Sequence, residues 1–140
     1  MLFFGEYLVN FSGNNRIIIP KKIREALGNK KTFTLTKSFD QCLSGFRNED
    51  WEKSVIQFMG DNVLSMENSH IKRHLFSSAV VLEIDEQGRV VIPKNLIDYA
   101  NLKDESVYVI GVGTYFEIWD KNKWEQYSKE IPKNIKSIKS

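Results

Sequence analysis

Two short segments of this chain carry an arginine at the edge of a polar turn, followed by a strand-forming run and a proline. The first is SGNNRIIIP at residues 12–20, and the second is DEQGRVVIP at residues 85–93. They lie 73 residues apart (89 − 16), measured from Arg16 to Arg89. A guanidinium group can donate paired hydrogen bonds to a phosphate or to guanine O6 and N7, and a carboxamide can read adenine. These residue types suit the binding of DNA better than covalent chemistry.

The candidate DNA-binding residues lie in and just after the two turns. They share a cationic or carboxamide side chain and are Arg16, Arg89, Asn14, Asn15, Lys21, Lys22, Arg24, Gln87 and Lys94. Ser12 and Asp85 start the turns, where a side-chain oxygen can cap turn amides. One such turn is more often an ordinary solvated loop. Its repetition with the arginine kept favours a binding surface, because a two-stranded ribbon fits the DNA major groove.

Charge differs between the two repeats. The whole chain has a formal net charge of only +2, which says little about a partner. Between Glu6 and Glu25, however, the sequence has four basic residues and no acidic one, whereas residues 85–98 carry a net charge of −1. The first turn also starts with Ser12 instead of an aspartate. We therefore expect the first turn to make the stronger contact with DNA.

The elements that must position the turns also occur twice. Runs rich in β-branched and aromatic residues flank each turn and predict two β-hairpins, 7–11 with 16–19 and 80–84 with 89–92. Pro20 and Pro93 stand where a short helix should begin, and Gly28 and Asn101 stand where it should end. Further strands are expected at 32–36, 41–46, 106–110 and 115–119.

Each repeat should close with a helix that carries a tryptophan, Trp51 or Trp124. Asn48 and Asp120 are the expected N-caps of these helices. The two tryptophans, together with Trp119, are expected in the core because their positions follow apolar strands.

The rest of the chain is an insert and a tail. Residues 53–78 have helical spacing, which the segment 60–62 should break into two helices. Beyond Pro132 the chain is rich in lysine and is expected to be weakly ordered.

Several classes of function lack support in the sequence. Cys42 is the only cysteine, which excludes an internal disulfide, is typical of a reducing cytosol and predicts a small buried residue. His70 and His74 have the spacing of zinc ligands, but no cysteine or aspartate stands near them as a third ligand. No nucleophile has a convincing partner base, no signal peptide is evident, and no apolar run approaches the ~20 residues of a membrane span. We predict a cytoplasmic protein that is not an enzyme and needs no metal, cofactor or small-molecule substrate.

The two repeated segments resemble the SpoVT-AbrB type of half-barrel, and two such halves in one chain resemble the MraZ family of bacterial regulators. Further matches are FGEY at residues 4–7, HIKRHLF at 70–76 and FEIWD at 116–120. The resemblance covers roughly residues 1–128 and is specific in its combination of motifs.

This resemblance implies a mainly β fold with short helices (α+β), in which two tandem halves exchange hairpins to form a β-barrel. The expected divisions are a first half at 1–52, a helical insert at 53–78, a second half at 79–128 and the lysine-rich tail at 129–140. It also implies that Arg16 and Arg89 contact double-stranded DNA and that several protomers assemble into a ring. The target would be repeated boxes upstream of the division and cell-wall gene cluster, with the protein associated with the nucleoid.

Two other functions stay open at this level. One is an antitoxin-like DNA-binding module that also binds a protein partner through its lysine-rich tail, which would then become helical. The other is a small enzyme or ligand-binding barrel, which would need a deep pocket with titratable groups that the sequence does not indicate.

Overall fold

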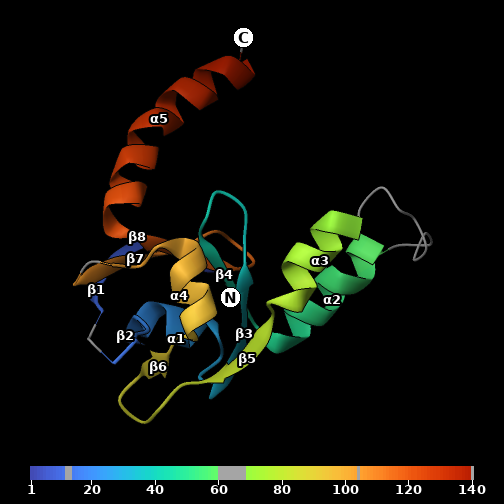
Figure 1. The fold of residues 1–140 in the computed structure, drawn as a ribbon, viewed down its shortest axis with the longest axis vertical. Helices are drawn as coiled ribbons and strands as arrows, with labels where there is room; N and C mark the ends of the chain where they lie inside the picture. Colours follow the sequence, from blue (N-terminus) through green and yellow to red (C-terminus); the bar gives the residue numbers. More distant parts are fainter. Residues whose placement is uncertain (12–13, 60–68, 104, 140) are drawn as a thin grey trace.

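The computed structural model describes residues 1–11, 14–59, 69–103 and 105–139. Within these residues the chain forms one antiparallel sheet, a small ribbon and five helices (Figure 1). The sheet order is β1 (Glu6–Asn10), β7 (Ser106–Gly111), β8 (Phe116–Asp120), β4 (Leu43–Phe46), β3 (Thr32–Lys37) and β5 (Val80–Glu83). The ribbon pairs β2 (Arg16–Ile18) with β6 (Arg89–Val91). The expected mainly β fold with short helices is confirmed.

The sheet repeats itself about its centre. β1 pairs with β7 as β5 pairs with β3, and β4 pairs with β8 between them. Leu43 lies opposite Ile118 and Gly45 opposite Phe116, so the 73-residue offset exchanges one pair for the other. The two repeats are therefore related by a pseudo-two-fold axis through the β4–β8 pair.

The two predicted hairpins are wrong in their strand pairing. β1 and β5 pair with strands of the sheet, while β2 and β6 pair with each other. Only the ends of the hairpins remain, as a bridge between Phe11 and Ile17 and a hydrogen bond from the Asp85 amide to the Arg89 carbonyl at 2.8 Å. Each turn thus passes the chain from an edge of the sheet into the ribbon, which is the exchange of hairpins implied by the family resemblance.

The core explains why the strands exchange. Ile17 and Val90 face inward from the ribbon and are 1% and 2% exposed, in one cluster with side chains of the sheet such as Phe33 and Val107. Burying such a side chain contributes roughly 1.5–3 kcal/mol. Neither repeat alone supplies both the sheet half and the ribbon that cover this core, so each needs the other.

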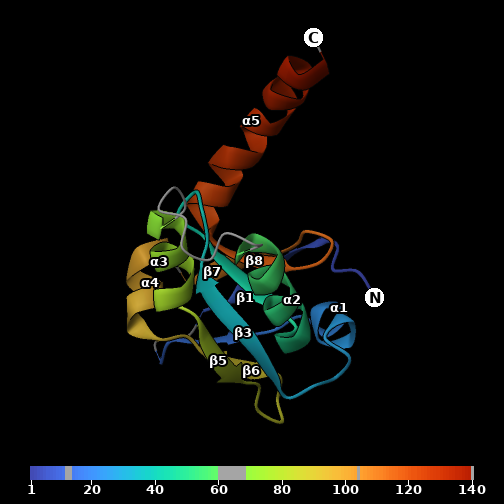
Figure 2. The same cartoon turned by 90° about the vertical axis from the view of Figure 1, so that its right-hand side faces the viewer.

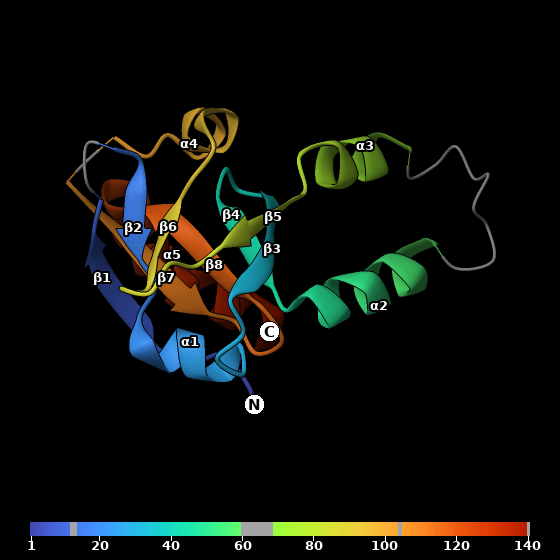
Figure 3. The same ribbon diagram turned by 90° about the horizontal axis from the view of Figure 1, so that it is seen from below.

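Short helices follow the ribbon strands. These are α1 (Lys21–Ala26) and α4 (Lys94–Ala100), which lie at opposite ends of the ribbon in Figure 3. Pro20 and Pro93 are the N-cap residues, so each helix begins one residue later than expected. The helix ends agree with expectation, since Gly28 has φ +75° and Asn101 is left-handed with φ +57°.

The predicted caps of the closing helices differ in outcome. The Asp120 carboxylate accepts a hydrogen bond from the Lys123 amide at 3.1 Å and caps α5 (Lys121–Lys139) as expected. Asn48 instead is the first residue of α2 (Asn48–Met59), so the predicted cap is wrong. Its carboxamide accepts a bond from the Thr34 hydroxyl at 2.8 Å and donates one to the Thr32 hydroxyl at 3.0 Å. These bonds tie α2 to β3, a tertiary use that the local sequence does not reveal.

The insert forms two helices, α2 and α3 (Ser69–Ser77), which project together from the sheet (Figure 3). The expected break at 60–62 lies outside the described residues.

α5 extends away from the sheet and continues past Pro132, contrary to the weak order expected there (Figure 1, Figure 2). At its base Trp124 and Tyr127 pack on the buried Trp119, with ring centroids 5.3 and 5.0 Å away, which anchors the start of the helix on the sheet.

Candidate nucleic-acid interface

The ribbon presents two arginines on its outer face. Arg16 lies opposite Val91 and Ile18 opposite Arg89, while Ile17 and Val90 form the inward-facing pair between them. Because side chains alternate along a strand, the first two pairs share the outer face. Strand spacing places the Cα atoms of the two arginines roughly 8 Å apart on a diagonal of the ribbon. The apolar partners Ile18 and Val91 are 43% and 49% exposed, so the face is open to a partner.

Ile17 and Val90 are themselves one 73-residue offset apart, so the pseudo-two-fold axis of the sheet also passes through this pair. The axis carries Arg16 onto Arg89. The two arginines therefore occupy equivalent positions at opposite ends of the ribbon.

Asp85 organises the second turn. Its Oδ1 accepts hydrogen bonds from the backbone amides of Gln87 and Arg89, both at 2.9 Å, and its Oδ2 pairs with the Arg89 Nε at 3.0 Å. The Arg89 backbone amide is the largest cause that lowers the pKa of the Asp85 carboxyl, so this group stays ionised at neutral pH. The side chain of Arg89 remains 36% exposed in this arrangement. The carboxylate thus fixes the direction of an arginine that still faces solvent.

In the described part of the first turn, the residue before the arginine has a backbone conformation like that of its counterpart in the second turn. Asn15 adopts φ +61° where Gly88 adopts φ +81°, the positive region that asparagine and glycine tolerate best. Asn14 is exposed at the tip and Arg16 is half-buried. Ser12, the expected turn cap, lies outside the described residues.

Each turn is docked on the helix start of the other repeat. The Ile19 amide donates to the Gly88 carbonyl at 2.8 Å, and the Ile92 amide donates to the Asn15 carbonyl at 2.8 Å. Arg24 adds a contact at the second turn. Its Nε donates to the Ile19 carbonyl at 3.0 Å, and its guanidinium packs so closely on Gly88 that a Cβ there would lie 2.9 Å from Cζ.

This docking sorts the predicted site residues into two groups that the sequence order does not suggest. We name them by their arginines. The Arg89 end contains Arg89, Gln87, Lys21, Lys22 and Arg24, and the Arg16 end contains Arg16, Asn14, Asn15 and Lys94. The basic stretch from Arg16 to Arg24, continuous in sequence, is therefore divided between opposite ends of the ribbon.

Sequence reasoning missed two cations beside the second turn. Lys30 and Lys31 line a pocket of about 510 Å³ together with Arg24, Asn29, Glu83, Ile84, Asp85 and Glu86. The Ile84 amide donates to the Lys31 carbonyl at 2.7 Å, which holds this loop against β5. Lys30 pairs with Glu49 at 3.7 Å. A basic pair just after the Gly28 helix stop was the signal available in the sequence.

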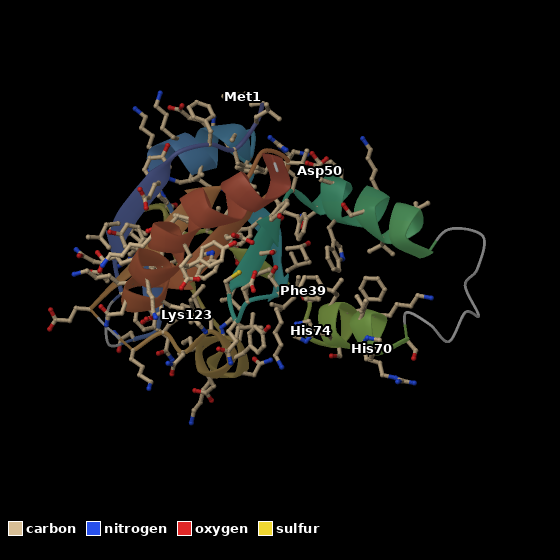
Figure 4. The ribbon with its side chains drawn as sticks, turned by 90° about the horizontal axis from the view of Figure 1, so that it is seen from above. Met1, Phe39, Asp50, His70, His74 and Lys123 are labelled. Atoms are coloured by element: carbon tan, nitrogen blue, oxygen red, sulfur yellow. The ribbon has the colours of Figure 1, made fainter. Side chains whose placement is uncertain are left out.

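The cysteine and the two histidines of the chain do not form a reactive or metal-binding site within the described residues. Cys42 is fully buried as expected, donates to the Phe39 carbonyl at 3.1 Å, and has its pKa raised by burial and by Glu117. His74 bonds the Ser38 carbonyl at 2.8 Å and stacks beside Phe39, with His70 farther out along α3 (Figure 4). Across the described ranges, no three His, Cys, Asp or Glu side chains are placed to share a metal ion.

Gly88→Ala should weaken the fold through the turn that carries Arg89. Alanine at φ +81° costs about 1–2 kcal/mol, and displacing the Arg24 guanidinium from the Ile19 carbonyl adds roughly 0.5–1.5 kcal/mol. Gly28→Ala is the matched control, since Gly28 has φ +75° but nothing within 4 Å of a new Cβ. Urea unfolding should therefore show a larger loss for Gly88→Ala than for Gly28→Ala. Equal losses would mean that the Arg24 contact does not support the turn.

Known proteins resemble this chain over nearly its full length. The family model described as "MraZ protein, putative antitoxin-like" matches residues 2–72 and 75–139. A protein named transcriptional regulator MraZ from Acetivibrio thermocellus is 40% identical over 98% of this chain and 94% of its own length. Proteins of the same name from Clostridium tetani and Ligilactobacillus salivarius are 40% and 35% identical, over 91% and 98% of this chain and 87% and 94% of their own lengths. None of the helices within the described residues is long and apolar enough to cross a membrane.

Proposed function

The chain belongs to the MraZ family, and on that basis we propose that it is a DNA-binding transcriptional regulator whose contact surface is the outer face of the β2–β6 ribbon. The relatives it matches over nearly its full length are named transcriptional regulators, a class of proteins that are not enzymes. The proposal places the protein in the cytoplasm, associated with the nucleoid.

One observation carries this proposal. Two arginines related by a pseudo-two-fold axis stand on the same exposed face of a two-stranded ribbon, and the helix starts at both ends of that ribbon bear lysines. Such a ribbon has the width to enter a major groove of about 12 Å, where arginine reads guanine. Lysines beside it suit contacts with the flanking phosphates, which position a protein without reading sequence.

We further propose that protomers assemble into a ring and bind repeated boxes upstream of the division and cell-wall gene cluster. One ribbon offers few phosphate contacts, so a single protomer should bind weakly. Several protomers held in a closed assembly would engage neighbouring boxes as linked sites, which raises apparent affinity through effective concentration.

The proposal is tested by fluorescence anisotropy with labelled DNA from the region upstream of the gene that encodes this protein. The expected result is tight binding to fragments that contain the repeated boxes and weak, salt-sensitive binding to the same fragments with the boxes scrambled. Equal affinity for both fragments would remove sequence-specific recognition. No binding to either would remove DNA as the partner.

The alternative role, an antitoxin-like module with a protein partner on its tail, needs a different test from the one the sequence suggested. Helix formation on binding cannot report a partner, because α5 is already helical to Lys139. Both roles use the ribbon, so truncation after residue 128 should leave the DNA affinity unchanged in either case. The two roles are separated by pull-down with the full and the truncated chain. A protein partner that binds the full chain and is lost on truncation would favour the antitoxin-like role.

A further inference from the structure

The exchange between repeats changes how charge is distributed at the proposed DNA surface. The second turn, residues 85–89, has a net charge of −1, and it is docked on α1, which has a net charge of +2. The first turn has a net charge of +1 from Arg16, and Asn15 docks it on the start of α4, which is neutral overall. Both ends of the ribbon therefore carry +1. The large difference between the two stretches of sequence disappears in the folded chain.

The neighbouring charges do not restore the difference. Lys30 and Lys31 adjoin the Arg89 end, but Lys30 pairs with Glu49 at 3.7 Å and Glu83 lines the same pocket as Lys31. Asp85, which the first turn replaces by Ser12, binds Arg89 yet leaves its side chain 36% exposed.

From these observations we infer that the two ends of the ribbon contribute equally to DNA affinity. We also infer that each end binds DNA through residues of both repeats. Arg89 acts with Lys21 and Lys22, and Arg16 acts with Lys94. A lysine of one repeat is thus a positioning residue for the arginine of the other. This inference rests on the proposed DNA-binding function and replaces the expectation that the first turn dominates.

The two ends can contribute equally to affinity and still recognise different bases. The tip of the first turn presents the carboxamide of Asn14, whereas the second presents Gln87 beside the acidic Glu86. Carboxamides can bond adenine edges, and a carboxylate can accept from cytosine N4. The orientation of the protomer on an asymmetric box would then be set by these side chains, because the two ends of the ribbon carry the same net charge.

Site-directed cleavage of operator DNA tests the shared ends. An iron chelate is attached to one new cysteine at a time, at Lys21→Cys, Gln87→Cys or Asn14→Cys. Cys42 should stay unlabelled because it is fully buried with a raised pKa. The inference expects the cleavage sites from Lys21→Cys to overlap those from Gln87→Cys, although the two residues are 66 positions apart (87 − 21). Overlap with the sites from Asn14→Cys would overturn it.

An affinity comparison tests the equality. Arg16→Ala and Arg89→Ala should weaken operator binding by the same factor, within about twofold, and Lys21→Glu and Lys94→Glu should also match each other within about twofold. A loss at least tenfold larger for Arg16→Ala, or for Lys21→Glu, would overturn the inference. If the unmodified protein neither binds nor cleaves the operator, the proposed function itself fails, an outcome distinct from unequal ends on DNA that is bound.

Discussion

Replacing both Arg16 and Arg89 by alanine should abolish specific binding to the operator while the protein stays folded. Each arginine that reads a base contributes roughly 1–3 kcal/mol, so the double variant should lose about 30-fold to more than 10,000-fold in affinity per engaged ribbon. The fold should survive because both side chains lie on the outer face of the ribbon, whereas Ile17 and Val90 form its buried face. Anisotropy titrations measure the first effect and thermal unfolding followed by circular dichroism measures the second.

Arg73→Ala is the matched control for this experiment. It removes an exposed arginine from α3, on the projecting insert, where its only described bond is a 3.5 Å contact with Ser69 (Figure 3). The control should bind the operator as the unmodified protein does. Wild-type affinity of a folded Arg16→Ala/Arg89→Ala variant would exclude the ribbon as the DNA surface.

Salt should weaken binding much more steeply on DNA with several boxes than on DNA with one. If each protomer places two or three cations on phosphates, an assembly on several boxes neutralises about six or more, and log K should fall with log salt with a slope near −5 or steeper. One protomer on one box should give a slope of only about −2 by the same rule.

The measurement uses DNA with one, two or three boxes, with molar mass determined by light scattering on the same samples. An oligomer present before DNA is added, together with slopes that steepen with box number, supports a preassembled ring. A monomer with the same shallow slope on every fragment would contradict both the ring and the multivalent mode of binding.

Local sequence determined the pieces of this protein well. The β-branched runs flanking each turn became strands, because such residues fit a pleated and half-buried surface. Asn15 and Gly88 took positive φ, and Gly28 and Asn101 ended their helices, because few other residues tolerate those backbone angles. The repeat could be recognised in the sequence because both copies must satisfy the same local geometry.

The tertiary structure decided what each piece pairs with. The β-branched run at 16–19 predicted a strand, but it could not show that this strand pairs with β6, 73 residues later, instead of with β1 next to it. Strand pairing is chosen by closure of a core that both repeats must build, and that choice has no local signal. It also determined that Lys21 lies with Arg89 and not with Arg16, because the chain leaves the ribbon at the end opposite to the one where Arg16 enters it. Residue types and turns therefore followed from the sequence, whereas the grouping of charges followed from the long-range packing that only the folded chain provides.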